Sequence, residues 1–217
     1  MKLWSDSFND GASMPAPFAF CEIDRDANGQ PTANHVRLAG NKNPHLAWSE
    51  APEGTQSYVL ICHDPDVPSV GDDVNQEGKT IPADLPRVDF FHWAMYDMPP
   101  NMICVTPGAF SDGVVARGKA GPECLVFMRH GINDYTGWFA GDAAMSGDYF
   151  GYDGPCPPWN DSIVHHYIFT LYALDVAQLA LDDKADGRAV RAALAGHILA
   201  QASITATYSL NPALHQD

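Results

Sequence analysis

The sequence has little positive charge and no long apolar run. Its 217 residues include 12 lysines and arginines against 27 aspartates and glutamates, which gives a formal net charge of −15 at pH 7. A duplex nucleic-acid binder needs a basic face to displace counterions, and docking on an anionic membrane needs polybasic clusters. No apolar stretch approaches the roughly eighteen residues that a spanning helix requires. We therefore expect neither a nucleic-acid partner nor stable membrane association.

The sequence also has few cysteines, and they form no close pair. Their number is odd and no CxxC occurs among the five, which are Cys21, Cys62, Cys104, Cys124 and Cys156. The stretch from Met1 to Asp6 lacks the basic stretch and the apolar core of a signal peptide. We therefore expect reduced thiols and a cytoplasmic location. On that expectation, the match of Asn160-Asp161-Ser162 to a glycosylation sequon is fortuitous.

What is present is the pattern of one large β-rich domain, predicted to span residues 1–217. Hydrophobic residues make up 46% of the chain and charged residues 18%, so a packed core is expected. Eighteen glycines and 17 prolines punctuate short apolar runs, as in domains with many strands. Strands that are buried on both faces are predicted over residues 58–62, 90–96, 124–128, 166–174 and 204–208.

One helix and two long loops are also expected. Val190, Leu194 and Ile198 recur at i+4 spacing, which predicts a helix over residues 188–201 with Asp186 as its N-cap. Residues 70–88 and 136–149 lack strand periodicity and are interpreted as loops. Loops of this length inside a compact domain are often functional.

Two segments place polar side chains beside predicted strands. Residues 64–69 read Asp-Pro-Asp-Val-Pro-Ser, and the two prolines restrict the backbone that carries the carboxylates. A capped turn is the ordinary explanation of such a sequence. His92 lies in the next strand, where alternation gives it one face with Phe90 and the opposite face to Phe91 and Trp93. A histidine among apolar strand residues is usually a hydrogen-bonded core residue.

A third segment combines a proline-rich turn with the start of a strand. Residues 154–158 read Gly-Pro-Cys-Pro-Pro, which cannot form a ladder and is expected to make a fixed, irregular wall. Strand alternation then places His165 and Tyr167 on one face and His166 on the other. An imidazole and a phenol would thus enter the same small volume. A strand end with an interfacial tyrosine is the competing interpretation.

Together these segments resemble the phosphatidylethanolamine-binding protein family, in its bacterial Raf kinase inhibitor-like branch. The similarity runs in the same order along almost the whole chain. It is carried by residues 41–49 (Asn-Lys-Asn-Pro-His-Leu-Ala-Trp-Ser), 51–55, 64–69, 92–93, 131–135 (Gly-Ile-Asn-Asp-Tyr), 154–158, 165–167, 172–175, 196–201 and 207–209.

The resemblance implies a mainly β fold, a Greek-key antiparallel β-sandwich with one or two flanking helices. It also implies a homodimer and a small pocket for phosphate-like anions, such as a phosphorylated small molecule, headgroup or side chain. Family members are generally described as binding or regulatory proteins rather than enzymes with an agreed reaction, and a protein partner of this chain is unknown. The ligand-binding residues carried over by motif are Asp64, Asp66, His92, Gly154, Cys156, Pro157, His165 and Tyr167.

Physical chemistry adds an expectation about the pocket. A phosphate needs donors, and imidazole N–H, phenol O–H and backbone N–H groups can supply them. Asp64 would repel an anion unless it pairs with a histidine or accepts from a protonated ligand. We expect Asp64 to raise a histidine pKa toward the physiological range, so that anion affinity strengthens from about pH 8 to about pH 6.

Other functions remain open at the level of the sequence. Asp64, His92 and His165 could form a two-histidine, one-carboxylate metal site of a hydrolase, although no close-spaced signature such as HExxH occurs and we expect no cofactor. Cys156 could be a nucleophile activated by His165. A protein-interaction module with a vestigial pocket is the third alternative. The expected loops, with their acidic residues, could form a lid or a dimer edge.

Overall fold

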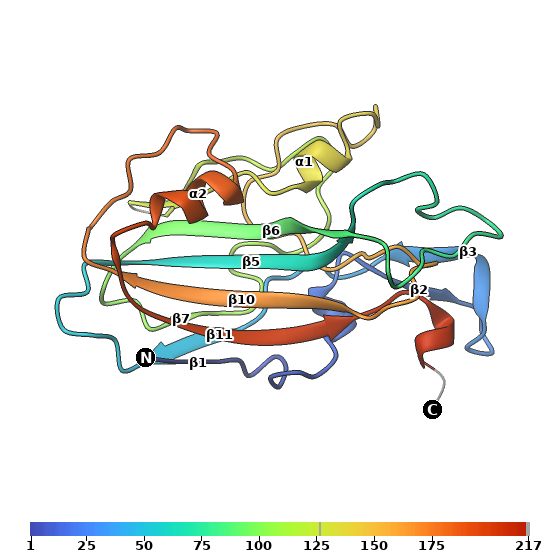
Figure 1. Ribbon diagram of the computed structural model, residues 1–217, viewed down its shortest axis with the longest axis horizontal. Coiled ribbons are helices and arrows are strands. Elements are labelled where there is room, and N and C mark those ends of the chain that lie inside the picture. Colours follow the sequence, from blue (N-terminus) through green and yellow to red (C-terminus); the bar gives the residue numbers. More distant parts are fainter. Residues whose placement is uncertain (126, 216–217) are drawn as a thin grey trace.

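The computed structural model describes residues 1–125 and 127–215, which form a sandwich of antiparallel sheets (Figure 1). The large sheet has the order β11 (Ile198–Tyr208), β10 (His165–Leu174), β5 (Ser57–Pro68), β6 (Arg87–Met98), β9 (Met128–His130) and β8 (Glu123–Leu125). The small sheet has the order β1 (Lys2–Trp4), β4 (Leu46–Ser49) and β7 (Cys104–Val105). A separate hairpin joins β2 (Cys21–Arg25) to β3 (Pro31–Leu38).

The strands of the large sheet are connected as a Greek key. Strand β10 returns after a long excursion to lie beside β5, which gives the order β10-β5-β6-β9. In Figure 1 the hairpin β2–β3 and the teal loop between β5 and β6 lie at the same end of this sheet. The expected mainly β, Greek-key architecture is therefore confirmed.

The central strands are buried on both faces, as their continuous apolarity predicts. Along β5, Leu60 and Cys62 belong to the core between the sheets, whereas Val59 and Ile61 belong to a second core under α2. All four side chains are almost fully buried. Strand alternation thus gives each central strand two apolar layers to pack.

The helices are short and flank the sandwich. They are α1 (Tyr135–Trp138), α2 (Gly187–Ala193) and the 3-10 turns η1 (Ala16–Phe18) and η2 (Pro212–His215). Asp186 caps α2 as expected, because its carboxylate accepts the Ala189 N–H at 2.8 Å. The predicted extension of this helix to residue 201 is wrong. Gly196 adopts a left-handed φ of +84°, and β11 begins at Ile198.

Other predicted boundaries are corrected by hydrogen bonding. The predicted strand over residues 124–128 is a hairpin of β8 and β9, and Val126 lies outside the described residues. The predicted loop over residues 70–88 comprises residues 69–86, because β5 ends at Pro68 and β6 begins at Arg87. The second predicted loop begins within α1.

A bulge changes the expected alternation in β6. Cys62 of β5 lies opposite Trp93, but the next residue, His63, lies opposite Phe91, so His92 is the extra residue. As a result Trp93 packs in the core between the sheets and Phe91 in the core under α2. The prediction that these two residues share a face is wrong. Bulges of this kind commonly redirect a side chain toward a site.

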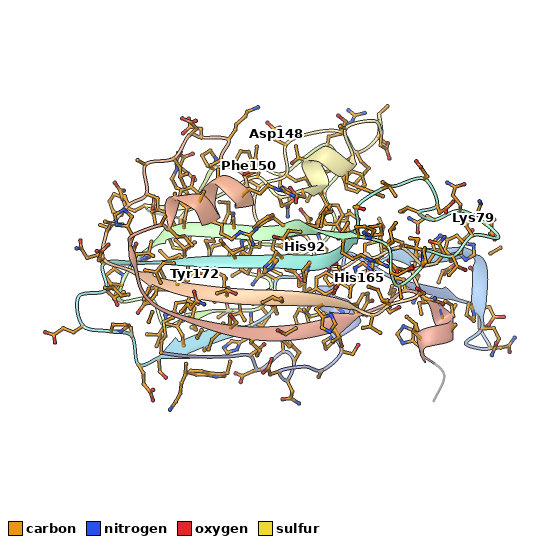
Figure 2. All side chains as sticks on the ribbon, viewed as in Figure 1. Lys79, His92, Asp148, Phe150, His165 and Tyr172 are labelled. Carbon is orange, nitrogen blue, oxygen red and sulfur yellow. A yellow bond between two sulfur atoms is a disulfide. The ribbon has the colours of Figure 1, made fainter. Side chains whose placement is uncertain are left out.

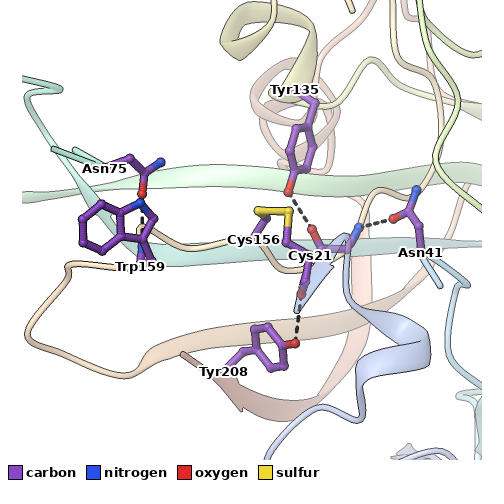
Figure 3. The surroundings of a disulfide bond; sticks show 8 residues. Cys21, Asn41, Asn75, Tyr135, Cys156, Trp159 and Tyr208 are labelled. Carbon is purple, nitrogen blue, oxygen red and sulfur yellow. Dashed lines mark hydrogen bonds between the residues drawn. A yellow bond between two sulfur atoms is a disulfide. The ribbon is translucent and has the colours of Figure 1, made fainter. Parts of the chain in front are cut away.

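The expectation of reduced thiols is wrong for two of the cysteines. Cys21, at the start of β2, forms a disulfide with Cys156 in the proline-rich turn (Figure 3). Sequence spacing gave no sign of it, because 135 positions separate the two residues. Cys62, Cys104 and Cys124 are free thiols. In the described part of the chain, no helix is long and apolar enough to cross a membrane.

Candidate functional site

A cavity of about 430 Å³ opens at the end of the large sheet, where the hairpin β2–β3 and the 69–86 loop meet it. The residues that line it are mostly apolar or aromatic, and neither lysine nor arginine is among them. They are Phe20, Cys21, Leu38, Asp64, Val67, Pro68, Gly71, Val74, Asn75, Phe90, His92, Tyr135, Trp138, Phe139, Cys156, Pro157, Pro158 and Tyr167.

Five of the eight residues predicted for the site line this cavity: Asp64, His92, Cys156, Pro157 and Tyr167. The other three lie next to it. Asp66 accepts the Nδ1–H of the exposed His166 at 2.8 Å. Gly154 begins the proline-rich turn and donates its N–H to Asn41, and His165 lies behind Asp64. Figure 2 shows His92 and His165 on neighbouring parts of the large sheet.

Asp64 ends a buried chain of alternating charges. Its Oδ2 lies 2.8 Å from Nδ1 of His165, whose Nε2 lies 3.1 Å from Oδ2 of Asp161. The guanidinium of Arg87 holds both oxygens of Asp161, at 2.6 and 3.1 Å. The side chains of Asp64, His165 and Asp161 are each at most 1% exposed. Because two carboxylates and two cations alternate, the chain is neutral when His165 is protonated.

The geometry keeps His165 protonated. Burial lowers the pKa of His165, but the hydrogen bonds to Asp161 and Asp64 and the charges of both carboxylates outweigh it and raise the pKa to about 9. The expected direction is therefore confirmed, although the pKa passes beyond the physiological range. Burial raises the pKa of Asp161, and its contacts with His165 and Arg87 reverse that effect. His165 therefore stays cationic between pH 8 and pH 6.

His92 presents an acceptor to the cavity. Its Nδ1 lies 2.7 Å from the carbonyl oxygen of Asp153, which can only accept, so Nδ1 carries the hydrogen. Burial lowers the pKa of His92, and the neighbouring carboxylates offset this only in part. The neutral ring then has a lone pair on Nε2. Neither imidazole supplies the donor that the sequence led us to expect, since both N–H groups of His165 are taken by carboxylates.

Tyr167 forms the floor of the cavity together with Asp64 and His92, which are the buried polar residues of the lining. Its hydroxyl is the group of this floor that can donate a hydrogen bond. This hydroxyl is buried and makes no hydrogen bond of normal geometry to a described residue, although it lies beside the Asp64 carboxylate. The ring meets that of His92 edge-on, with 5.1 Å between centroids. Burial raises the pKa of Tyr167 well above its usual value, so the hydroxyl keeps its proton. The neighbouring Tyr135 differs, because its hydroxyl donates to the Gly154 carbonyl at 2.7 Å.

A buried network around Asp153 fixes the wall of the cavity. Its carboxylate accepts from the side-chain amides of Asn41 and Asn133, both at 2.7 Å, and pairs with the Lys119 ammonium at 2.8 Å. Asn41 also accepts the Gly154 N–H at 2.8 Å (Figure 3). Because the Asp153 carbonyl accepts from His92 and Asn41 accepts from Gly154, the network holds His92 and the proline-rich turn in fixed positions relative to each other.

Glycine is required at position 154 by a close approach. A Cβ there would lie 2.3 Å from the carbonyl oxygen of Phe18. The same region is joined by the disulfide, whose two cysteines both line the cavity. The backbone N–H of Phe20 also donates to the Pro155 carbonyl at 2.9 Å. The turn and the first strand of the hairpin therefore form one continuous wall.

Sequence reasoning missed Arg87 and Asp161, which complete the charge chain. Asp161 precedes His165 by four residues, but it lies outside the strand and was noticed only as part of a sequon. The apolar rim was also missed, because Leu38, Val74 and Trp138 belong to three separate segments that only the fold brings together. No local pattern connects such residues.

Two alternative functions do not fit this geometry. In the described residues, no group of three histidine, cysteine, aspartate or glutamate side chains is placed to hold a metal ion, and both nitrogens of His165 face carboxylates. Cys156 is in a disulfide, so its sulfur is not a nucleophilic thiolate. The Asp64, His92 and His165 set and the Cys156 thiol therefore do not support a hydrolase.

The fold and the cavity define a class of small β-sandwich proteins that have a ligand pocket at one end of the main sheet. Comparison with known proteins gives the particular family. Residues 4–209 match the family described as Phosphatidylethanolamine-binding protein. The chain therefore belongs to the phosphatidylethanolamine-binding protein family.

Individual relatives agree with this assignment. The chain is 31% identical to the UPF0098 protein YbhB of Escherichia coli over 209 residues, which is 96% of this chain and 100% of that protein. It is 29% identical to a UPF0098 protein of Aquifex aeolicus over 208 residues, covering 96% and 88% of the two chains. The crystal structure of Escherichia coli YbcL, described as a new member of the mammalian PEBP family, matches the fold with a TM-score of 0.65 at 23% identity, covering 96% and 97%.

Proposed function

We propose that this protein binds a phosphate monoester as its singly charged, protonated form, with the apolar substituent against the rim of the cavity. The observation that carries the proposal is the composition of the floor. Asp64 and His92 Nε2 can accept hydrogen bonds there, and the hydroxyl of Tyr167 can donate one. A monoanionic phosphate matches this set, because its P–OH group donates and its charged oxygens accept.

The net charge of the floor favours a ligand with one negative charge over a ligand with two. The chain from Arg87 to Asp64 is neutral, and no lysine or arginine lines the cavity. A dianion would be buried without a cation to compensate it, which is costly. Two of the roughly four lone-pair sites of the Asp64 carboxylate are taken, by His165 and by the Asp66 N–H. The remaining lone pairs can accept a hydrogen bond from the P–OH group of the ligand.

The apolar wall supports a ligand that is larger than phosphate itself. Leu38 and Trp138 line the cavity although more than half of each side chain is exposed, so a bound apolar group would remove them from water. The cavity volume lies in the range of small-molecule sites. Inorganic phosphate would leave this rim unused.

Calorimetric titration with hexyl phosphate and methyl phosphate tests the proposal, because both probes carry the same headgroup. We expect hexyl phosphate to bind with 1:1 stoichiometry and much more tightly than methyl phosphate. Burial of a methylene contributes about 0.8 kcal/mol, so five of them set an upper limit near a thousandfold in Kd. If neither probe binds at pH 6, the proposal is contradicted.

A further inference from the structure

Asn160 connects the wall of the cavity to the loop over residues 69–86. It follows the proline-rich turn and is only 5% exposed. Its Oδ1 accepts the N–H of Asn75 at 3.0 Å, and its carbonyl accepts the N–H of Ile81 at 3.0 Å. Its Nδ2 donates to the carbonyls of Asp73 at 2.8 Å, Lys79 at 3.2 Å and Gln76 at 3.4 Å. The side chain of Asn160 thus holds the loop between Asp73 and Lys79, and its backbone holds Ile81.

The segment that Asn160 holds includes part of the cavity lining, because Asn75 lines the cavity and Val74 lies between the two held residues Asp73 and Asn75. Gly71, Val74 and Asn75 are the lining residues of the loop. Asn75 is held twice, because its Oδ1 also accepts the Trp159 N–H at 3.1 Å (Figure 3). It adopts a left-handed φ of +56°. Such a backbone persists when its surroundings determine it, and here Asn160 and Trp159 do so.

We propose that Asn160 is a positioning residue that sets the preference of the pocket for the apolar part of its ligand. This inference rests on the proposed function and deepens it. A preordered rim gives the apolar group a surface without further cost, whereas an untethered loop would have to be ordered when the ligand binds. Asn160 does not line the cavity, so its effect reaches the ligand only through residues 71–75.

The test compares the Kd values of hexyl phosphate and methyl phosphate for the wild type and for Asn160→Ala. We expect the Kd of methyl phosphate to change by less than about twofold and that of hexyl phosphate to rise at least about tenfold, because the lost contacts concern methylenes. The matched control is Asn43→Ala. Asn43 is also a buried asparagine that holds a loop, with bonds to Phe110, Ser111 and Thr106, but none of these loop residues lines the cavity.

Asn43→Ala should lose stability and keep the wild-type ratio of the two Kd values. If Asn160→Ala does not fold, Asn160→Asp replaces it, because the carboxylate still accepts the Asn75 N–H but cannot donate to the carbonyls of Asp73, Gln76 and Lys79. The same shift in the ratio, of smaller size, is then expected. Hydrogen exchange at the Asn75 amide, which donates to the Asn160 side chain, provides a measurement without ligand, and it should accelerate in Asn160→Ala.

The outcomes separate the two proposals. Failure of the wild type to bind either phosphate contradicts the proposed function. A wild type that prefers hexyl phosphate, with an Asn160→Ala variant that keeps the same ratio or loses affinity for both probes equally, overturns the role of Asn160. A selective loss of affinity for hexyl phosphate, absent from Asn43→Ala, supports it.

Discussion

The Nδ1–H of His165 donates to Oδ2 of Asp64 over 2.8 Å, with both side chains removed from water. The cation therefore lies directly behind the carboxylate that faces the cavity. This arrangement keeps Asp64 as an acceptor at the floor without giving the cavity a net charge. A protein of net charge −15 thus has a cavity floor that is neutral.

His165 should make stability depend on pH in the alkaline range. Its pKa is about 9 in the folded protein, against about 6.5 for a free histidine. A raised pKa contributes stability that is complete below about pH 6.5 and is lost as pH rises through about 9. The loss is on the order of 3 kcal/mol. Urea unfolding at pH 6 to 9.5 measures it.

Asp161→Asn provides the control for this prediction. It removes one of the two carboxylates that face His165 and leaves Arg87 without its partner. The alkaline loss of stability should become smaller and move to lower pH. An unchanged slope in Asp161→Asn would mean that another group causes it.

Asp64→Asn should let the pocket bind an anion that carries no proton. The remaining chain of Arg87, Asp161 and His165 carries one net positive charge. We expect hexyl sulfate, which has no proton to donate, to bind at least about tenfold more tightly than to the wild type. Circular dichroism must show that the variant is folded, because breaking a buried pair costs roughly 3 to 5 kcal/mol. A weaker affinity for hexyl sulfate in the folded variant would count against the model of the floor.

Tyr167→Phe should separate binding from stability. The hydroxyl makes no hydrogen bond of normal geometry to a described residue, so its removal should change the free energy of unfolding by less than about 1 kcal/mol. The Kd of hexyl phosphate should rise about tenfold or more, because a hydrogen bond to a charged oxygen is lost. Tyr135→Phe is the matched control, since it breaks the bond to Gly154 and should lower stability.

The disulfide should support both the wall and the fold. Replacing Cys21 with serine opens a link across 135 positions, and loss of a native disulfide typically costs about 2 to 5 kcal/mol. Hexyl phosphate should also bind more weakly, because both cysteines line the cavity. Cys104→Ser, at a free thiol outside the cavity, should change neither quantity. Equal melting temperatures for wild type and Cys21→Ser would contradict this role.

The strands were predictable because burial on both faces leaves a direct pattern in β5, β6 and β10. The motif residues Asp64, His92 and Tyr167 were predictable from resemblance, and the structure brings them together. The bulge at His92 and the pairing of Cys21 with Cys156 were not, because each depends on contacts between distant segments. The early end of α2 did have a local signal in Gly196, but the i+4 apolar spacing continued past it.

The pH dependence of hexyl phosphate affinity, with hexyl sulfate as the comparison, tests the central claim most directly. The second pKa of a phosphate monoester is about 6, so its monoanion rises from roughly 1% at pH 8 to about half at pH 6. Since neither His92 nor His165 gains a proton in most of this range, hexyl phosphate should bind tens of times more tightly at pH 6 while hexyl sulfate stays weak and flat. A flat profile for hexyl phosphate, or parallel rises for both ligands, would contradict recognition of the protonated phosphate.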